Sequence, residues 1–109
     1  MNDVNKQAVP LFTLYAREEM ITTRNFGTVT VRELPVKVFE DIAIKHRGDA
    51  DNNALVREVM CAAVEGPNGE RFTPELLDEL PARALFDIAE LLAAAVRNNN
   101  MRNDDPEKA

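Results

Sequence analysis

The sequence predicts an α+β fold that is mainly α-helical, with a small β-hairpin beside a compact bundle of about four helices. The chain has 109 residues, the length of one domain. Aromatic residues make up only 6% of it, so the core rests on Leu, Val, Ile and Ala, and Leu and Ala favour helices. β-Branched residues instead concentrate within residues 21–34. We expect a flexible N-terminus over 1–8, one domain over 9–98 with the hairpin near 20–33, and a disordered tail over 99–109.

The first segment of the domain, residues 9–20, fits either a helix or a strand. With Pro10 in a first helical turn, Leu11, Leu14 and Tyr15 would share one helical face. The Phe-Thr-Leu-Tyr run in the same segment is also typical of a strand. We favour the helix and leave the strand open.

Residues 21–34 predict the β-hairpin. An Asn-Phe-Gly turn at 25–27 joins its two strands, because the glycine can adopt a positive φ. Val29 and Val31 alternate with polar residues, which is typical of a half-buried strand. A lone hairpin is marginally stable in water, so its free edge either pairs with another copy of the chain or is covered by a loop or helix.

Two helices are expected after the hairpin. A proline begins the first, over 35–46, because the residue before a proline avoids the α region. The second, over 53–65, is capped by Asp51 or Asn52. The apolar face expected on the first of these helices consists of Val38, Phe39, Ile42 and Ala43.

Two more helices end the domain. Thr73, followed by a proline, is a typical N-cap of a short helix that stops at Pro81. The last helix is expected over 82–98, where Arg83 pairs with Asp87 one turn later. Its expected inner face consists of Leu85, Ile88, Ala89, Leu92 and Val96.

The charge of the chain is unevenly distributed. Residues 49–109 hold 6 Lys/Arg and 13 Asp/Glu, whereas residues 1–48 are nearly neutral. Nucleic acid repels such an acidic half, so we expect no nucleic-acid partner. The longest apolar run, at 91–96, is too short to cross a membrane, so we expect no membrane partner either.

Residues that carry catalysis are nearly absent. The chain contains no serine, one histidine (His46) and one cysteine. Cys61 lies in an apolar helical run, where free cysteine behaves as a small hydrophobe. The acidic turn at 49–52 lacks the Gly and Glu positions of a calcium loop. We therefore expect no enzyme, no catalytic residue, no metal site and no cofactor, but a protein that works by offering a binding surface.

That binding surface is expected on the hairpin and on the short helix that follows Thr73. Both segments carry apolar side chains outside the two longer helices. The candidate partner-binding residues are Phe26, Val29, Val31, Leu76, Leu77 and Leu80.

Three segments carry a resemblance to a known family. They are TVTVREL (28–34) followed at once by a proline-started helix, the Ala/Leu/Val-rich helix LVREVMCAAV (55–64), and GERFTPELLDELPARALFDIAELLAAAVRN (69–98). Together the pattern resembles the tail assembly chaperones of long-tailed bacteriophages, specifically of siphophages with lambda-like or HK97-like tails. The resemblance covers residues 28–98 and rests on size and polarity, without invariant catalytic residues.

The resemblance implies a specific function. Such chaperones bind the long, helical tape measure protein in the host cell cytoplasm, keep it soluble and help recruit tail tube protein subunits. They are not retained in the mature virion, and many have a longer form made by ribosomal frameshifting. The expected partners are thus the tape measure protein and the tail tube protein. We also expect a homo-oligomer, formed through the hairpin edge or through a helix face that the fold leaves uncovered.

Two other functions fit the composition. An acidic, phage-encoded inhibitor or decoy of a host nucleic-acid-binding protein would explain the negative C-terminal half. Against it, four arginines are interspersed among the acidic residues of that half (Arg57, Arg71, Arg83 and Arg97). A minor structural tail protein is the other alternative, and its presence in purified virions would distinguish it.

Overall fold

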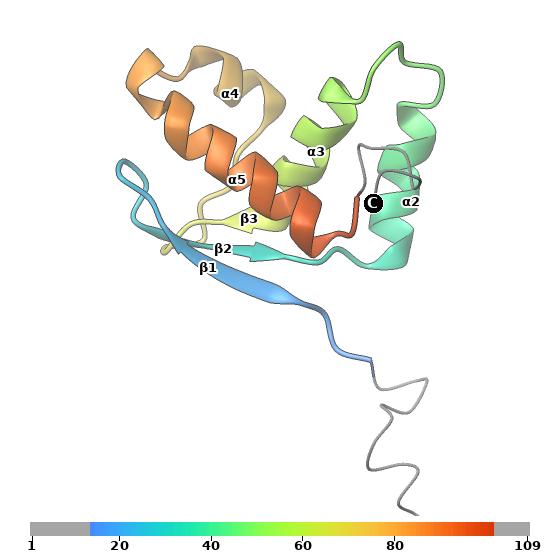
Figure 1. The fold of residues 1–109 in the computed structure, drawn as a ribbon, viewed down its shortest axis with the longest axis horizontal. Helices are drawn as coiled ribbons and strands as arrows, with labels where there is room; N and C mark the ends of the chain where they lie inside the picture. Colours follow the sequence, from blue (N-terminus) through green and yellow to red (C-terminus); the bar gives the residue numbers. More distant parts are fainter. Residues whose placement is uncertain (1–13, 102–109) are drawn as a thin grey trace, which may run out of the picture.

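The computed structural model describes residues 14–101, so the N-terminus predicted over 1–8, residues 9–13 and the end of the predicted tail lie outside the described residues. Figure 1 shows a three-stranded sheet with helices packed over it, which confirms the predicted α+β class. The elements, in chain order, are β1 (Glu18–Thr22), β2 (Thr28–Arg32), α2 (Val36–Lys45), α3 (Asn53–Ala63), β3 (Val64–Glu65), α4 (Pro74–Glu79), the 3₁₀ turn η2 (Ala82–Ala84) and α5 (Leu85–Asn98).

The core lies between the sheet and two of the helices. α3 and α5 both pack against β2, and α5 also contacts β1 (Figure 1). The other two helices, α2 and α4, contact α3 at the periphery. Burying each larger apolar side chain stabilises the fold by about 1.5–3 kcal/mol. The buried cluster consists of Ile21, Val29, Val31, Ile42, Val59, Met60, Ala63, Val64, Leu91, Ala94 and Ala95.

The hairpin forms as predicted. β1 and β2 pair antiparallel with Met20 opposite Thr30, and Gly27 in the connecting turn has a φ of +74°. Side chains of a strand alternate between its two faces, so Val29 and Val31 point into the core. Thr28 and Thr30 point to the opposite face of the sheet, together with Met20, which lies opposite Thr30.

The third strand was not predicted. The sequence pattern extends the second helix to residue 65, but the helix ends at Ala63 and the next two residues form β3. Val64 and Glu65 pair antiparallel with Val31 and Thr30. β3 thus covers part of the β2 edge, and β1 and β3 are the two edge strands of the sheet in the described residues.

The helix favoured over residues 9–20 is wrong in its described part. Residues 14–17 have no regular structure, and Glu18 begins β1. Two interactions explain the strand. Ladder hydrogen bonds to β2 hold its backbone, and Ile21 is buried against the core. Tertiary pairing therefore outweighed a weak local helical pattern.

Helix α5 forms over Leu85–Asn98, and its predicted inner face is right only in part: Ile88 and Leu92 are partly buried and pack against the core cluster. The prediction placed Leu85 and Ala89 inside, yet Leu85 is 64% exposed and Ala89 is also exposed. The predicted pair of Arg83 with Asp87 is also absent, because the carboxylate turns inward to the hairpin. The residues of α5 that are buried are Asp87, Leu91, Ala94, Ala95 and Asn98.

The first three residues of the predicted tail, 99–101, are folded. The side chain of Asn99 accepts a hydrogen bond from the Leu34 N–H at 2.7 Å and donates one to the Arg32 carbonyl at 3.1 Å. Met101 packs against the core cluster. Residues 99–101 are therefore part of the folded domain. Within residues 14–101, no helix is both long enough and apolar enough to span a bilayer.

Candidate functional site

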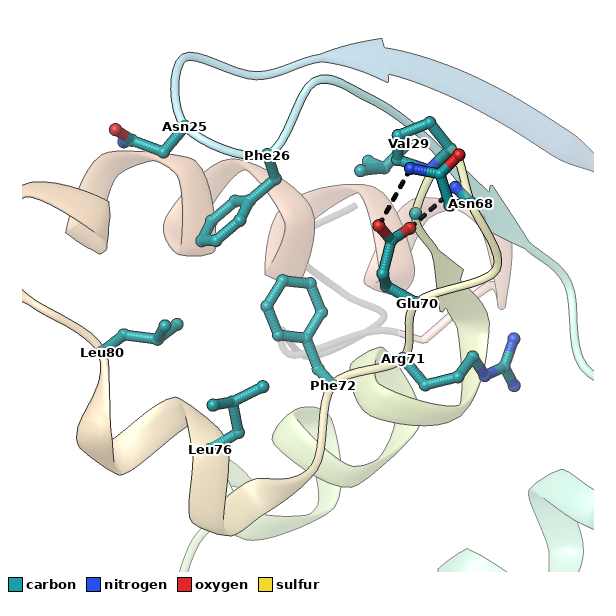
Figure 2. Close-up of a pocket in the computed structure, with 11 residues that line it drawn as sticks. Asn25, Phe26, Val29, Asn68, Glu70, Arg71, Phe72, Leu76 and Leu80 are labelled. Carbon is teal, nitrogen blue, oxygen red and sulfur yellow. Dashed lines mark hydrogen bonds between the residues drawn. The ribbon is translucent and has the colours of Figure 1, made fainter.

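A groove opens between the hairpin turn, the loop after β3 and helix α4. It has a volume of about 410 Å³. Figure 2 shows four apolar side chains directed into it from three segments, Phe26 from the turn, Phe72 from the loop, and Leu76 and Leu80 from α4 and its end. We call this the apolar groove. Its remaining lining residues are Asn25, Val29, Gly66, Pro67, Asn68, Glu70 and Arg71.

Two aromatic rings form the centre of the groove. The rings of Phe26 and Phe72 lie edge to face, with centroids 5.2 Å apart and planes 88° apart. This arrangement matches the positive ring edge to the negative face and stabilises the pair by about 0.5–1.5 kcal/mol beyond the area it buries. Both rings are only half-buried, so apolar surface remains open to a partner.

A buried carboxylate fixes the turn that carries Phe26. Asp87, in the first turn of α5, is only 3% exposed. Its oxygens accept hydrogen bonds from the Arg24 N–H at 3.1 Å, the Asn25 N–H at 2.8 Å and the Asn25 side-chain amide at 2.8 Å. Burial favours protonation, but these hydrogen bonds outweigh it and hold the pKa of Asp87 below its usual value. We call this arrangement the turn clamp.

The loop opposite the turn is held by a second carboxylate. Glu70 accepts hydrogen bonds from the Asn68 N–H at 2.7 Å and the Asn68 side-chain amide at 3.3 Å, as Figure 2 shows. A Cβ on Gly66 would lie 2.5 Å from Glu70 Oε1, so a side chain there would displace the carboxylate. Glycine at this position therefore lets the loop close tightly beside the groove.

Helix α4 forms the outer wall. Its N-cap is Thr73, as predicted, whose hydroxyl accepts a hydrogen bond from the Leu76 N–H at 3.1 Å. Glu75 and Glu79 lie exposed on the same helix, whereas Asp78 pairs with Arg57 of α3 at 2.7 Å. The wall beside the groove is therefore acidic as well as apolar.

Four of the six predicted partner-binding residues line this groove, namely Phe26, Val29, Leu76 and Leu80, but Val29 is only 1% exposed and so offers almost no surface to a partner. The other two lie elsewhere. Val31 is fully buried in the core, because it points inward from the central strand, so it offers no surface to a partner. Leu77 is half-buried and packs against the core cluster.

Sequence reasoning missed Phe72. The signal that could have found it is its position directly before the N-cap Thr73, where an apolar residue usually packs and fixes the entry of the chain into a helix. Phe72 here also supplies one of the two rings of the groove.

The described residues offer little reactive chemistry. Cys61 is buried, and burial raises the pKa of its thiol to about 11, so it stays protonated at neutral pH. His46 lies between Asp49 Oδ2 at 2.8 Å and Glu58 Oε1 at 2.7 Å. The hydrogen bonds that the imidazole donates to these two carboxylates, first to Glu58 and then to Asp49, raise the pKa of His46. Within residues 14–101, no group of three metal-ligating side chains is placed to hold an ion.

Comparisons of the chain with protein families, with curated proteins and with solved structures find no match. The functional assignment therefore rests on the apolar groove and on the resemblance carried by residues 28–98.

Proposed function

We propose that this protein is a phage tail assembly chaperone that binds apolar helical segments of the tape measure protein in the apolar groove. Binding keeps that long partner soluble in the host cytoplasm until tail tube subunits are recruited around it. The chaperone then leaves, so it is not part of the mature virion.

The groove is the observation that supports this proposal most strongly. It combines two half-buried rings with two leucines on a helix wall, at the surface of a small domain. An amphipathic helix binds such a groove by inserting apolar side chains spaced three or four residues apart. A long helical protein repeats this pattern many times, so one groove can serve many equivalent segments.

Charge on the groove wall favours a basic partner segment. Glu75 and Glu79 lie exposed on α4, and neither forms an ion pair with another residue in the described range. The loop contributes one acid and one cation to the groove, Glu70 and Arg71. Lysines flanking the apolar face of a partner helix would therefore be attracted, which mainly raises the association rate and sets orientation.

The decoy alternative receives less support. A nucleic-acid mimic needs a continuous acidic face, but many acids of this chain pair with cations. Arg32 binds both Glu18 and Glu65, Arg97 binds Glu19, and other pairs neutralise Asp41, Glu58 and Asp78. Nothing in the structure favours a minor structural tail protein over the chaperone.

Co-expression tests the proposal. The chaperone hypothesis predicts that a neighbouring gene encodes a very long helical protein. This protein is the probe, and it is expressed alone and together with this chain. We expect it to be insoluble alone and soluble, in complex, when co-expressed. An unchanged soluble fraction, or the absence of such a gene, would contradict the proposal.

Matched variants locate the binding to the groove. Leu76→Asp places a charge on the groove wall, at a side chain that is already 39% exposed. Ile44→Asp makes the same kind of change on α2, at a side chain that is 51% exposed. We expect the first variant to lower affinity for the co-expressed partner about tenfold or more, and the second to leave it unchanged.

A further inference from the structure

Helix α5 exposes an apolar face that the fold leaves uncovered. Phe86 is 74% exposed and Leu85 64% exposed, which makes them two of the most exposed large apolar side chains in the described range. Ala89 and Ala93 are also exposed on the same helix. Exposed apolar side chains that gather on one face, unlike single scattered ones, mark an interaction surface. The outer face of α5 therefore lacks a partner in the isolated chain.

The exposed residues form one stripe. At 100° per residue, Phe86, Ala89 and Ala93 lie within a narrow arc of the helix, opposite the buried Leu91 and Ala95. Leu85 borders the stripe on one side. The stripe thus presents a large ring beside small alanines, a shape in which a ring from a second helix can pack closely.

Two charges of opposite sign border the other side of the stripe. Arg83 precedes Phe86 by three residues and Glu90 follows it by four. Neither forms an ion pair with another residue in the described range, unlike Arg97, which binds Glu19. They lie roughly 11 Å apart along the axis, too far to pair with each other.

This pattern is self-complementary. When two copies of α5 pack antiparallel about a two-fold axis, the same edge of each helix meets the other. A register that places Phe86 of each copy over Ala89 of the other brings each Arg83 within reach of the opposing Glu90. Two ion pairs then flank two packed rings, and no like charges face one another.

The free edge of the sheet is a poorer candidate. Strand β1 carries Glu18 and Glu19, preceded by Arg17, and charged residues on an edge strand oppose pairing with another strand. Both glutamates are also already held by arginines of the same chain.

We infer that the outer face of α5 is a homodimer interface, in which two antiparallel copies of the helix pack Phe86 against Ala89 and pair Arg83 with Glu90. The interface is small, so the dimer is weak and forms with rising concentration. The inference does not depend on the proposed function.

Sedimentation equilibrium of the full chain across the micromolar range tests the interface. We expect a monomer–dimer equilibrium that Phe86→Asp weakens about tenfold or more. The matched control is Tyr15→Asp, which changes another aromatic side chain, 84% exposed, and should leave association unchanged. Both substitutions are at exposed positions, and circular dichroism would verify that each variant folds.

Charge reversal tests the register. Arg83→Glu and Glu90→Arg should each weaken self-association, because each creates two repulsive contacts in the dimer. An equimolar mixture of the two variants should associate again, because both cross-pairs become attractive in the heterodimer. A wild-type chain that stays monomeric, or a mixture that associates no better than its components, would overturn the inference.

Discussion

The two ends of this small fold are fastened by different chemistry. At the hairpin end, the turn clamp holds the chain through a buried carboxylate, Asp87, that accepts hydrogen bonds from backbone N–H groups. At the α2 end, His46 bridges Asp49 and Glu58, and we call this arrangement the histidine bridge. The clamp uses a carboxylate whose pKa is lowered from its ordinary value, so it is ionised at neutral pH, whereas the bridge uses an imidazole whose pKa is raised from its ordinary value.

This difference in chemistry indicates that the hairpin end, which carries the apolar groove, has the more fixed shape. The turn clamp positions Phe26, a wall of the apolar groove, and does so independently of ordinary changes in pH. The histidine bridge fastens α2, a peripheral helix whose main contact is α3. A binding surface benefits from a preorganised wall, because ordering a wall on binding costs affinity.

Removing the turn clamp should have the largest effect. Asp87→Ala leaves the N–H groups of Arg24 and Asn25 without their acceptor, so we expect the free energy of unfolding to fall by about 2–3 kcal/mol. Urea unfolding, monitored by circular dichroism, measures this change in the free energy of unfolding. Asp87→Asn, which keeps one acceptor oxygen, should lose less. A loss equal for both variants would contradict the role of the hydrogen bonds.

The turn clamp also makes stability fall in acid. The folded pKa of Asp87 is lowered, so its contribution is present above the ordinary value of 3.8 and is lost as the pH falls through the folded value. Thermal unfolding of the wild type and Asp87→Asn, measured from neutral pH downward, should therefore converge in acid. Parallel curves would show that the carboxylate charge contributes nothing.

A substitution in the loop should have a smaller effect on the same end. Gly66→Ala forces the Glu70 carboxylate to move, and we expect a loss of about 1 kcal/mol because that side chain is flexible. In the background of Glu70→Ala the same substitution should cost clearly less. If Gly66→Ala lowers the free energy of unfolding equally in both backgrounds, the strain lies in the backbone and not in the contact with Glu70.

The histidine bridge should show the smallest, and only local, effect. The folded pKa of His46 is raised above its ordinary value of 6.5, so its contribution is complete below that value and is lost as the pH rises through the folded value. Hydrogen exchange of the α2 amides, corrected for intrinsic rates, should become faster as the pH rises through this pKa. The amides of β2 should stay protected over the same pH range. In His46→Gln the pH dependence of α2 should disappear. Loss of protection in β2 at the same pH would contradict a local effect.

Much of the fold could be predicted from short-range signals. The turn at Gly27, the N-cap at Thr73 and the breaks at Pro35 and Pro81 all depend on residues close in sequence, and the structure confirms each. Strand β3 and the first residues of β1 could not be predicted, because both are defined by pairing with β2. Local composition does not contain that information.

The candidate site could likewise be predicted only where its residues give a short-range signal in the sequence. Phe26 and Leu76 stand out as apolar residues at a turn and on a short helix. Their convergence depends on Asp87, which bonds to residues 62 and 63 positions away in the chain. The face of α5 was misassigned because this carboxylate, read as a surface charge, is in fact buried.

The central claim is that the apolar groove binds an apolar helical segment of a longer partner. Titrating ¹⁵N-labelled protein with a segment of the co-expressed helical partner, and following amide shifts by NMR, tests it most directly. If the groove binds the segment, we expect shifts concentrated at Phe26, Phe72 and Leu76. These shifts should be lost in Leu76→Asp and kept in Ile44→Asp. Shifts concentrated on α2 or on the outer face of the sheet, or no shifts at all, would contradict it.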